Sequence, residues 1–235
     1  MSTLFVVATP IGNLSDISER AKETLRSVDV VLCEDTRVTG KLMAYLKDRP
    51  PLTPPLKGGG PELVSYHQHS DQSKTSKIFD FIKEGKDIAL VTDAGTPSIS
   101  DPGGRLVEEL VNHFGVQLKI VPIPGPSAII SALSVSGFPA DEFLFLGFPP
   151  NKKGRQTYFD RVAKIASTVV FYESTHRIFK TLDEINARCP DRPIMVGREL
   201  TKMYESLYRG TASSVTEQLK LTSIKGEFVI VIRSL

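Results

Sequence analysis

The most informative segment of this chain is Leu90-Val91-Thr92-Asp93-Ala94-Gly95-Thr96-Pro97-Ser98-Ile99-Ser100-Asp101-Pro102-Gly103-Gly104. An apolar run ends there at a carboxylate, and the residues after it are small, polar or conformationally restricted. Glycine reaches backbone angles closed to other residues and proline fixes φ, so the segment specifies a shaped loop. Open α/β sheets bind ligands at the carboxyl ends of their strands. The segment therefore predicts a strand followed by a ligand-binding loop, against the alternative of an ordinary strand-to-helix connection, which is usually shorter.

Strands and helices alternate on both sides of this segment. The pattern predicts strands at 4–8, 29–33, 63–66, 88–91 and 118–121 and helices at 16–28, 38–45, 74–84 and 104–114. Asp16 with Glu19 matches a capping box at the start of the first helix, and Gly85 ends the third. Regular alternation predicts a mostly parallel sheet. Its polar strand ends would lie along one edge, where they can form one site.

A proline-rich segment interrupts this alternation at Pro122-Ile123-Pro124-Gly125-Pro126-Ser127-Ala128. A helix cannot run through it, because proline lacks an N–H and restricts the preceding residue. We therefore expect an N-terminal α/β domain over 1–121 and a C-terminal α/β domain over 122–235. The second domain is expected to contain strands at 143–148, 169–172, 194–197, 207–208 and 228–232 and helices at 128–135, 157–165, 175–188 and 213–219. The alternation of these elements is less regular, which favours a mixed sheet.

The composition is that of an ordinary globular protein, with 40% hydrophobic and 24% charged residues among 235. No apolar run approaches the roughly 20 residues that cross a bilayer, and the first residues lack the features of a signal peptide, so a cytoplasmic location is expected. Two cysteines are too few for a disulfide framework or a zinc cluster. Residues 140–235 contain 15 Lys and Arg against 11 Asp and Glu. This basic balance suits a polyanionic partner, although a mixed solvated surface gives the same count.

Common nucleotide-binding motifs are missing. A dinucleotide fingerprint needs G-x-G-x-x-G after the first strand, and the turn at 8–13 has one glycine; no P-loop pattern is present either. Asp93 and Asp101 form a possible magnesium pair, but Asp101 fits better as a local cap before Pro102. His67 and His69 alternate along an extended chain and point to opposite faces, which disfavours a metal site. No metal is expected.

Three other segments have competing interpretations. The Pro/Gly-rich residues 50–61 have no periodicity and are expected to form an exposed insertion. Lys152-Lys153-Gly154-Arg155 is a basic loop that either meets phosphate or is merely solvated. Glu173 and Arg177 follow a strand and are spaced i to i+4, so a structural ion pair competes with a functional role.

Several segments, in this order along the chain, carry a resemblance to a known family. They are Val7-Ala8-Thr9-Pro10-Ile11-Gly12-Asn13-Leu14, Glu34-Asp35-Thr36-Arg37, Thr92-Asp93-Ala94-Gly95-Thr96-Pro97, Pro124-Gly125-Pro126-Ser127-Ala128, Tyr172-Glu173-Ser174-Thr175-His176-Arg177 and Arg198-Glu199-Leu200-Thr201-Lys202. Together they closely resemble the ribosomal RNA branch of the tetrapyrrole methylase superfamily, the class III S-adenosylmethionine methyltransferases.

The resemblance implies a fold, a cofactor and a reaction. It implies a two-domain tetrapyrrole methylase fold, with a mostly parallel first sheet, a mixed second sheet and an S-adenosylmethionine cleft between the domains. It also implies a homodimer that transfers a methyl group to the ribose 2′-hydroxyl of a cytidine in the decoding region of 16S rRNA, within the small ribosomal subunit. Carried over by position, the cofactor contacts are Ile11, Asp93, Thr96, Ile99, Ser127, Ala128, Phe171 and Tyr172.

A second set of residues is expected to act on the RNA ribose and phosphates. The candidates are Glu34, Asp35, Arg37, Glu173, Glu199 and Lys202, with a carboxylate or a Lys202 of depressed pKa as the base. Two alternatives remain open at this point. One is a small-molecule tetrapyrrole methylase with the same fold and cofactor, and the other is a non-catalytic nucleotide-binding module on the ribosome.

Overall fold

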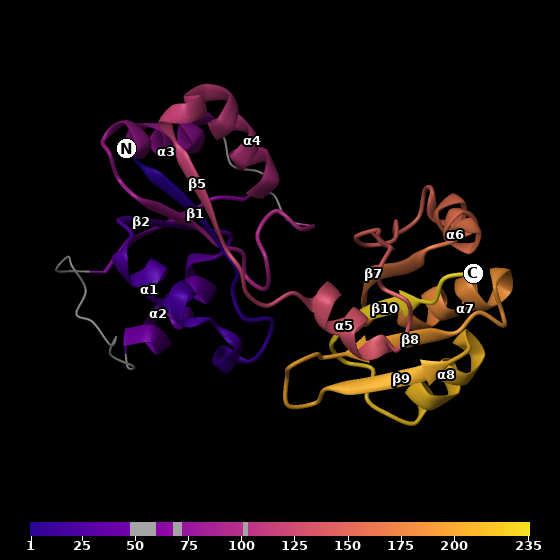
Figure 1. Ribbon diagram of the computed structural model, residues 1–235. Coiled ribbons are helices and arrows are strands. Elements are labelled where there is room, and N and C mark those ends of the chain that lie inside the picture. The colour runs from indigo at the N-terminus through magenta and orange to yellow at the C-terminus, as the bar shows by residue number, and fades with distance from the viewer. Residues whose placement is uncertain (48–59, 68–71, 101–102) are drawn as a thin grey trace. The chain divides into compact units, whose positions relative to one another are not determined.

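The computed structural model describes residues 1–47, 60–67, 72–100 and 103–235. The chain divides into two compact units, Met1–Ser127 and Ala128–Leu235 (Figure 1). Most of the Pro/Gly-rich segment 50–61, together with His69 and Asp101, lies outside the described residues. The expected cofactor cleft between domains stays a prediction. No helix in the described ranges is long and apolar enough to cross a membrane.

The first unit contains a five-stranded sheet in the order β3-β2-β4-β1-β5, with every neighbouring pair parallel. Its strands are β1 (Thr3–Val7), β2 (Val30–Cys33), β3 (Glu62–Ser65), β4 (Ile88–Leu90) and β5 (Lys119–Ile123). Its helices are α1 (Glu19–Ser27), α2 (Thr36–Lys47), α3 (Gln72–Lys83) and α4 (Gly103–Phe114), with short 3-10 turns at Leu14–Asp16 and Gly115–Gln117. The predicted parallel sheet is confirmed.

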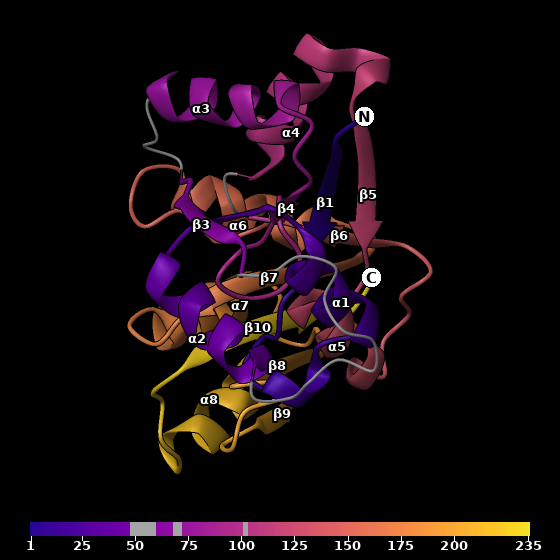
Figure 2. The same ribbon diagram turned by 90° about the vertical axis from the view of Figure 1, so that its left-hand side faces the viewer.

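Helices cover both faces of this sheet (Figures 1 and 2). On one face, Leu25 of α1 and Leu46 of α2 pack into a buried cluster with Val31 of β2. On the other face, Ile78 of α3 and Leu106 of α4 pack with Leu32 and neighbouring strand residues. Strands buried on both faces read as continuous apolar runs, which explains why β2 and β4 contain no polar residue.

The start of α1 differs from the prediction, whereas the end of α3 agrees with it. The cap of α1 is Ser18, whose Oγ accepts a hydrogen bond from the Ala21 amide, and not Asp16, which belongs to the preceding 3-10 turn. Asn13 caps that turn. The predicted capping box at Asp16 and Glu19 is therefore wrong, because a separate 3-10 turn precedes the helix. Gly85 follows α3 with a φ of +81°, as expected for a residue that ends a helix.

The second unit contains a mixed five-stranded sheet in the order β6-β7-β10-β8-β9. β6 and β7 are parallel, and the remaining pairs are antiparallel. The strands are β6 (Phe143–Phe145), β7 (Thr168–Ser174), β8 (Ile194–Arg198), β9 (Ser206–Gly210) and β10 (Glu227–Ile232); the helices are α5 (Ala128–Ser136), α6 (Arg155–Lys164), α7 (Ile178–Arg188) and α8 (Ala212–Lys220). The predicted mixed sheet is confirmed.

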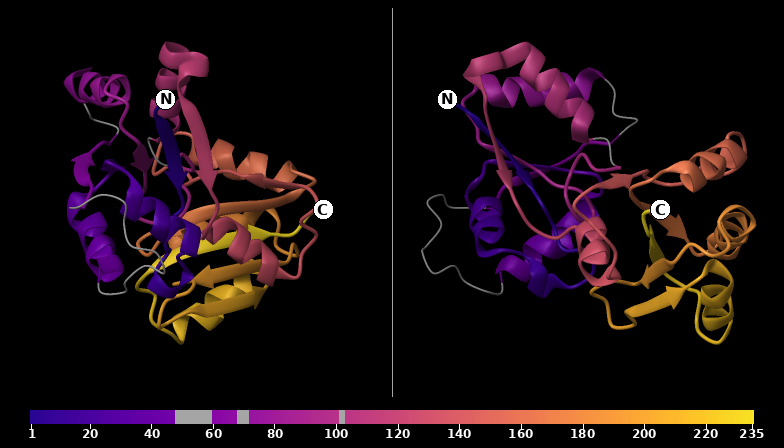
Figure 3. Two further views of the ribbon diagram at one scale, coloured as in Figure 1. Left: turned by 60° about the vertical axis from the view of Figure 1, so that its left-hand side comes forward. Right: turned by 45° about the vertical axis from the view of Figure 1, so that its right-hand side comes forward.

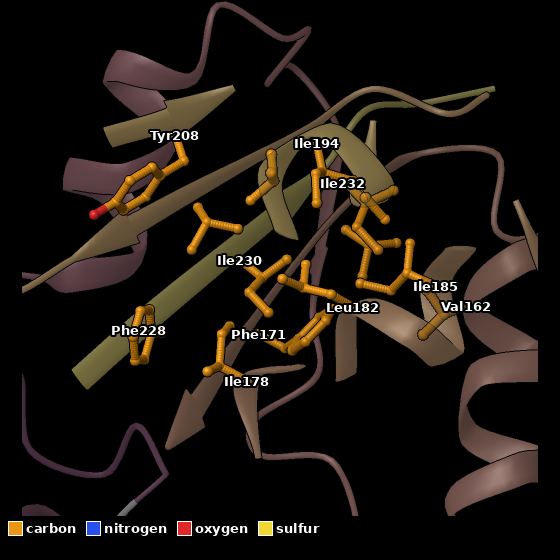
Figure 4. Close-up of a cluster of buried hydrophobic side chains, with 14 of the residues drawn as sticks. Val162, Phe171, Ile178, Leu182, Ile185, Ile194, Tyr208, Phe228, Ile230 and Ile232 are labelled. Atoms are coloured by element: carbon orange, nitrogen blue, oxygen red, sulfur yellow. The ribbon is translucent and has the colours of Figure 1, made fainter. Parts of the chain in front are cut away.

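One face of the second sheet packs against α6, α7 and α8 (Figure 3). Figure 4 shows the resulting core, in which Phe171 of β7 and Ile230 of β10 meet Ile178 and Leu182 of α7. On the opposite face, α5 contacts β7 and β10. The helix expected from residue 175 begins at Ile178, because residues 175–177 form a turn after β7.

The expected division after Val121 falls inside a strand. β5 continues to Ile123 and includes Pro122, which is tolerated because β5 is at the sheet edge. By contacts, the first compact unit extends to Ser127.

Candidate functional site

Loops that follow β1 and β4 are joined at the carboxyl edge of the first sheet. The backbones of Thr9 and Gly95 exchange two hydrogen bonds, with N···O distances of 2.9 and 3.1 Å. The buried Thr9 hydroxyl also donates to the Thr92 carbonyl at 3.0 Å. The loop after β4 is therefore fixed against the turn after β1.

Glycines allow this edge to close. Gly95 has a φ of +88°, and a Cβ there would lie 3.4 Å from Cγ2 of Ile11. A Cβ on Gly125 would lie 3.0 Å from the Cβ of Ala8, so the segment after β5 approaches the end of β1 closely. The Thr96 hydroxyl donates to the Pro126 carbonyl at 3.3 Å. Three strand ends are thus brought together, as the parallel sheet predicted.

The loop after β2 joins the same edge through carboxylates. The Thr92 hydroxyl donates to Oε1 of Glu34 at 2.7 Å, and the Asp35 amide donates to Oδ1 of Asp93 at 3.3 Å. Arg37 forms an ion pair with Asp35 at 2.6 Å. Hydrogen bonds from the Arg37 side chain and backbone lower the pKa of Asp35 to about 2. Burial, assisted by the Asp35 charge, raises the pKa of Asp93.

In the loop after β4, the side chains of Asp93, Ala94 and Ile99 are exposed. Ser98 and Ser100 adopt positive φ values of 73° and 64°, conformations that non-glycine residues rarely occupy. Such strain clusters at ligand-binding loops. The glycines and prolines predicted a shaped loop, but no sequence signal singled out these two serines.

Near the carboxyl end of β7 in the second sheet, Glu173 is fully buried and forms ion pairs. Its carboxylate pairs with Nε of Arg177 at 2.8 Å and with Nη1 of Arg155 at 3.8 Å, and it accepts hydrogen bonds from the Thr181 hydroxyl at 2.5 Å and the Ser174 amide at 2.7 Å. Its side chain is 0% exposed and that of Arg155 3%. Because Glu173 has no exposed surface with which to touch a substrate, its environment supports the structural interpretation over the catalytic one.

Arg155 is the residue in this network that the sequence did not reveal. It stood in a basic loop and was expected on the surface, yet it is buried and donates to the Thr181 hydroxyl at 2.6 Å. Its guanidinium also lies over the Phe159 ring, 4.9 Å from the centroid. Lys152 and Lys153 in the same run are exposed, so adjacent basic residues have opposite environments.

Glu199 and Lys202 meet beside the start of β10. Lys202 Nζ lies 2.9 Å from carboxylate oxygens of both Glu199 and Glu227, and the Glu227 amide donates to Oε1 of Glu199. Glu199 holds a φ of +52°, and a Cβ on Gly226 would lie only 2.5 Å from its Cγ. The turn therefore depends on Gly226.

The protonation of this cluster corrects one expectation. Burial alone would lower the pKa of Lys202, but hydrogen bonds to Glu227 and Glu199 outweigh burial and raise it. Lys202 is therefore not a base of depressed pKa. Burial would raise the pKa of Glu199, yet the Glu227 amide and Lys202 lower it instead. Both groups remain charged near neutral pH.

Comparison with known proteins places this geometry in a family. Residues 3–216 match the family described as Tetrapyrrole (Corrin/Porphyrin) Methylases. The chain belongs to this family. Its members are methyltransferases that use S-adenosylmethionine as methyl donor.

Relatives of the tetrapyrrole methylase chain cover it almost completely. Ribosomal RNA small subunit methyltransferase I of Bacillus subtilis is 42% identical over 99% of this chain and 75% of its own length. The protein of the same name from Thermotoga maritima is 39% identical over 99% of this chain and 98% of its own length.

Solved structures share the fold at low identity. Cobalt precorrin-4 methyltransferase has a TM-score of 0.67 at 19% identity, covering 98% of this chain and 94% of its own. Uroporphyrin-III C-methyltransferase from Thermus thermophilus, complexed with S-adenosylhomocysteine, has a TM-score of 0.62 at 16% identity, covering 97% and 96%. These likenesses establish the tetrapyrrole methylase fold for both units of the chain.

The residues expected to contact the cofactor differ in their solvent exposure. Asp93 and Ile99 are exposed and Thr96 is half-buried, whereas Ile11 is buried and faces the Gly95 position. Ser127 is the last residue of the first unit and Ala128 is the first residue of the second, and both are half-buried. The Phe171 side chain lies in the hydrophobic core of the second unit (Figure 4), and the whole residue is 0% exposed, so Phe171 presents no surface to a ligand. Tyr172, on the other face of β7, packs against Phe145 and Phe148.

Replacing Gly226 with alanine is expected to lower the thermal unfolding midpoint more than the same change at Gly137. Both positions have positive φ, +129° at Gly226 and +76° at Gly137, which costs an alanine about 1–3 kcal/mol. Only at Gly226 would the Cβ collide with Glu199, adding about 1–3 kcal/mol of overpacking. Circular dichroism melts of the two variants measure the difference, and equal losses would contradict the packing argument.

Proposed function

We propose that this methyltransferase transfers the methyl group of S-adenosylmethionine to the ribose 2′-hydroxyl of a cytidine in the decoding region of 16S rRNA. The observation that carries the proposal is the identity of about 40% over nearly the whole chain to proteins named ribosomal RNA small subunit methyltransferase I. The proposal includes a cytoplasmic homodimer that acts on the small ribosomal subunit. Charge supports it, because residues 140–235 in the second unit contain 15 Lys and Arg against 11 Asp and Glu.

The carboxyl edge of the first sheet suits the cofactor. Asp93 presents an exposed carboxylate that can accept hydrogen bonds from ribose hydroxyls, and Thr96 and Ile99 follow on the same loop. The bridge between Thr9 and Gly95 fixes this loop before any ligand arrives. Ser127 and Ala128 continue from the same edge, and Tyr172 completes the proposed set from the second unit.

The sulfonium methyl of the cofactor is electrophilic, so the protein must place the ribose hydroxyl and remove its proton. Arg37 in the first unit and Lys202 in the second supply positive charge for binding RNA phosphates. Asp35 and Glu199 have lowered pKa values, which makes both poor bases. Glu34 is the remaining candidate carboxylate and is half-buried at the sheet edge, where Thr92 orients it. We therefore assign the base to Glu34.

Asp93→Asn is expected to weaken S-adenosylmethionine binding by about tenfold to hundredfold, the value of a hydrogen bond to a charged group. The pKa of Asp93 is raised, so its ionised form, and the affinity that depends on it, is present above that pKa and lost as pH falls through it. This loss should begin at a higher pH than for an ordinary aspartate. Calorimetric titration across acidic pH measures both effects.

The control for this titration is Asp80→Asn, on the exposed surface of α3. That variant should bind S-adenosylmethionine like the parent chain at every pH. Parent-like affinity and pH dependence in Asp93→Asn would remove Asp93 from the cofactor site.

One assay separates the three functions. The protein is incubated with methyl-labelled S-adenosylmethionine and, in parallel, with unmethylated small ribosomal subunits, with naked 16S rRNA and with uroporphyrinogen. We expect label in 16S rRNA. Label in the porphyrinoid alone would establish a small-molecule methylase, and no label in any sample would favour a binding module.

A further inference from the structure

A basic loop precedes α6 in the second unit. Lys152 and Lys153 are exposed, and in the described part of the chain neither ammonium takes part in an ion pair. Phe148 begins the same segment with 54% of its surface exposed, and its ring packs 5.3 Å from that of Tyr172. An exposed aromatic ring and exposed cations in one loop are the combination with which proteins hold single-stranded RNA, by base stacking and phosphate contact.

The buried Glu173 network holds this loop by its backbone. Arg177 donates from Nη1 to the Pro149 carbonyl at 2.9 Å and also bonds Oδ1 of Asn151. Arg155 donates from Nη1 to the Pro150 carbonyl at 3.2 Å. Each arginine is itself fixed by Glu173. Three consecutive loop residues are therefore tied to a carboxylate with no solvent exposure.

Thr181 connects the two sides of the network. Its hydroxyl donates a hydrogen bond to Glu173 and accepts one from Nη2 of Arg155, so it bridges the carboxylate and the guanidinium. The side chain is 0% exposed and cannot reach a ligand. An effect of Thr181 on RNA binding would have to pass through the position of the loop.

We propose that residues 148–153 form an RNA contact surface, in which Lys152 and Lys153 bind phosphates and Phe148 stacks on a base. The Glu173, Arg155, Arg177 and Thr181 side chains are positioning residues that hold this surface in place. This inference rests on the proposed function, because the RNA it binds is the methyl acceptor.

The first test replaces Lys152 and Lys153 together with alanine. Binding of a 16S rRNA decoding-region fragment is measured against salt concentration, alongside binding of S-adenosylmethionine. The slope of log affinity against log salt is expected to fall by about one for each lysine, with cofactor affinity unchanged. The control is Lys164→Ala, an exposed lysine at the opposite end of α6, about 15 Å away along the helix axis. It should keep the parent slope.

The second test compares Thr181→Val with Thr181→Ser. Valine removes the bridging hydroxyl without changing surface charge, and serine retains it. Thr181→Val is expected to raise KM for RNA several-fold with KM for S-adenosylmethionine unchanged, and Thr181→Ser to restore the parent value. A purely structural role would lower the active fraction, and hence kcat, without moving KM.

The outcomes distinguish this inference from the proposed function. If the parent protein methylates 16S rRNA while the double lysine variant keeps the parent salt slope, the contact surface is wrong and the function stands. If Thr181→Val lowers only kcat, the positioning role is wrong. If the parent protein neither binds nor methylates 16S rRNA, the proposed function fails.

Discussion

Replacing Glu173 with alanine is expected to lower the free energy of unfolding of the second unit by about 3–5 kcal/mol. The reason is that Arg155, with 3% of its side chain exposed, would keep its charge in the interior without a carboxylate partner. The Thr181 hydroxyl would lose its acceptor at the same time. Urea unfolding followed by circular dichroism measures the loss.

Two controls sharpen this result. Glu173→Gln keeps the shape and part of the hydrogen bonding, so it should fall between the parent and the alanine variant. Lys77→Ala removes an ion pair with Glu62 in which both side chains are about half exposed, and exposed pairs contribute little. A Glu173→Ala variant no less stable than Lys77→Ala would show that the buried pair does not stabilise the fold.

Replacing Glu34 with glutamine is expected to lower kcat for RNA methylation by about 100-fold or more, because a positioned general base contributes roughly 10²–10⁴ to rate. Glutamine can still accept the hydrogen bond from the Thr92 hydroxyl, so the loop should keep its shape. Single-turnover methylation with saturating cofactor and RNA isolates this step.

The matched comparison for Glu34→Gln is Asp35→Asn, on the next residue of the same loop. Asp35 is paired with Arg37 and its pKa is about 2, so its replacement should alter kcat much less. Parent-like turnover in Glu34→Gln would remove Glu34 as the base. Alanine substitution of each of Glu34, Asp35, Arg37, Glu199 and Lys202 with unchanged turnover throughout would overturn the proposed polar set.

Periodicity predicted the order of strands and helices in both units, because buried parallel strands and amphipathic helices leave distinct apolar patterns. Boundaries were less accurate where side chains compete for the same backbone groups. Asp16 and Ser18 are both good caps, and only the fold decides between them. The late start of α7 also could not be predicted, since the turn at 175–177 has the composition of a first helical turn.

The positions of Glu34 and Asp93 at the carboxyl edge of the first sheet were predictable, because polar residues that follow parallel strands lie together there. The burial and the ion-pair partners of the candidate side chains were not predictable from the sequence. Glu173 and Arg177 form the i to i+4 pair that the spacing allowed, but nothing local shows that Arg155 joins them in the interior. A Lys202 of depressed pKa was one of two kinds of candidate base, and Glu227, the carboxylate partner that helps raise its pKa, comes from a distant strand. Protonation depends on such long-range partners.

The most direct test of the central claim is to map the methylated nucleotide. Small ribosomal subunits from a strain lacking the enzyme are incubated with the purified protein and S-adenosylmethionine, and the 16S rRNA is digested and analysed by mass spectrometry. We predict one added 2′-O-methyl group, on a cytidine of the decoding region. A methyl group on a base, on a nucleotide outside that region, or on no nucleotide of the 16S rRNA would contradict the account.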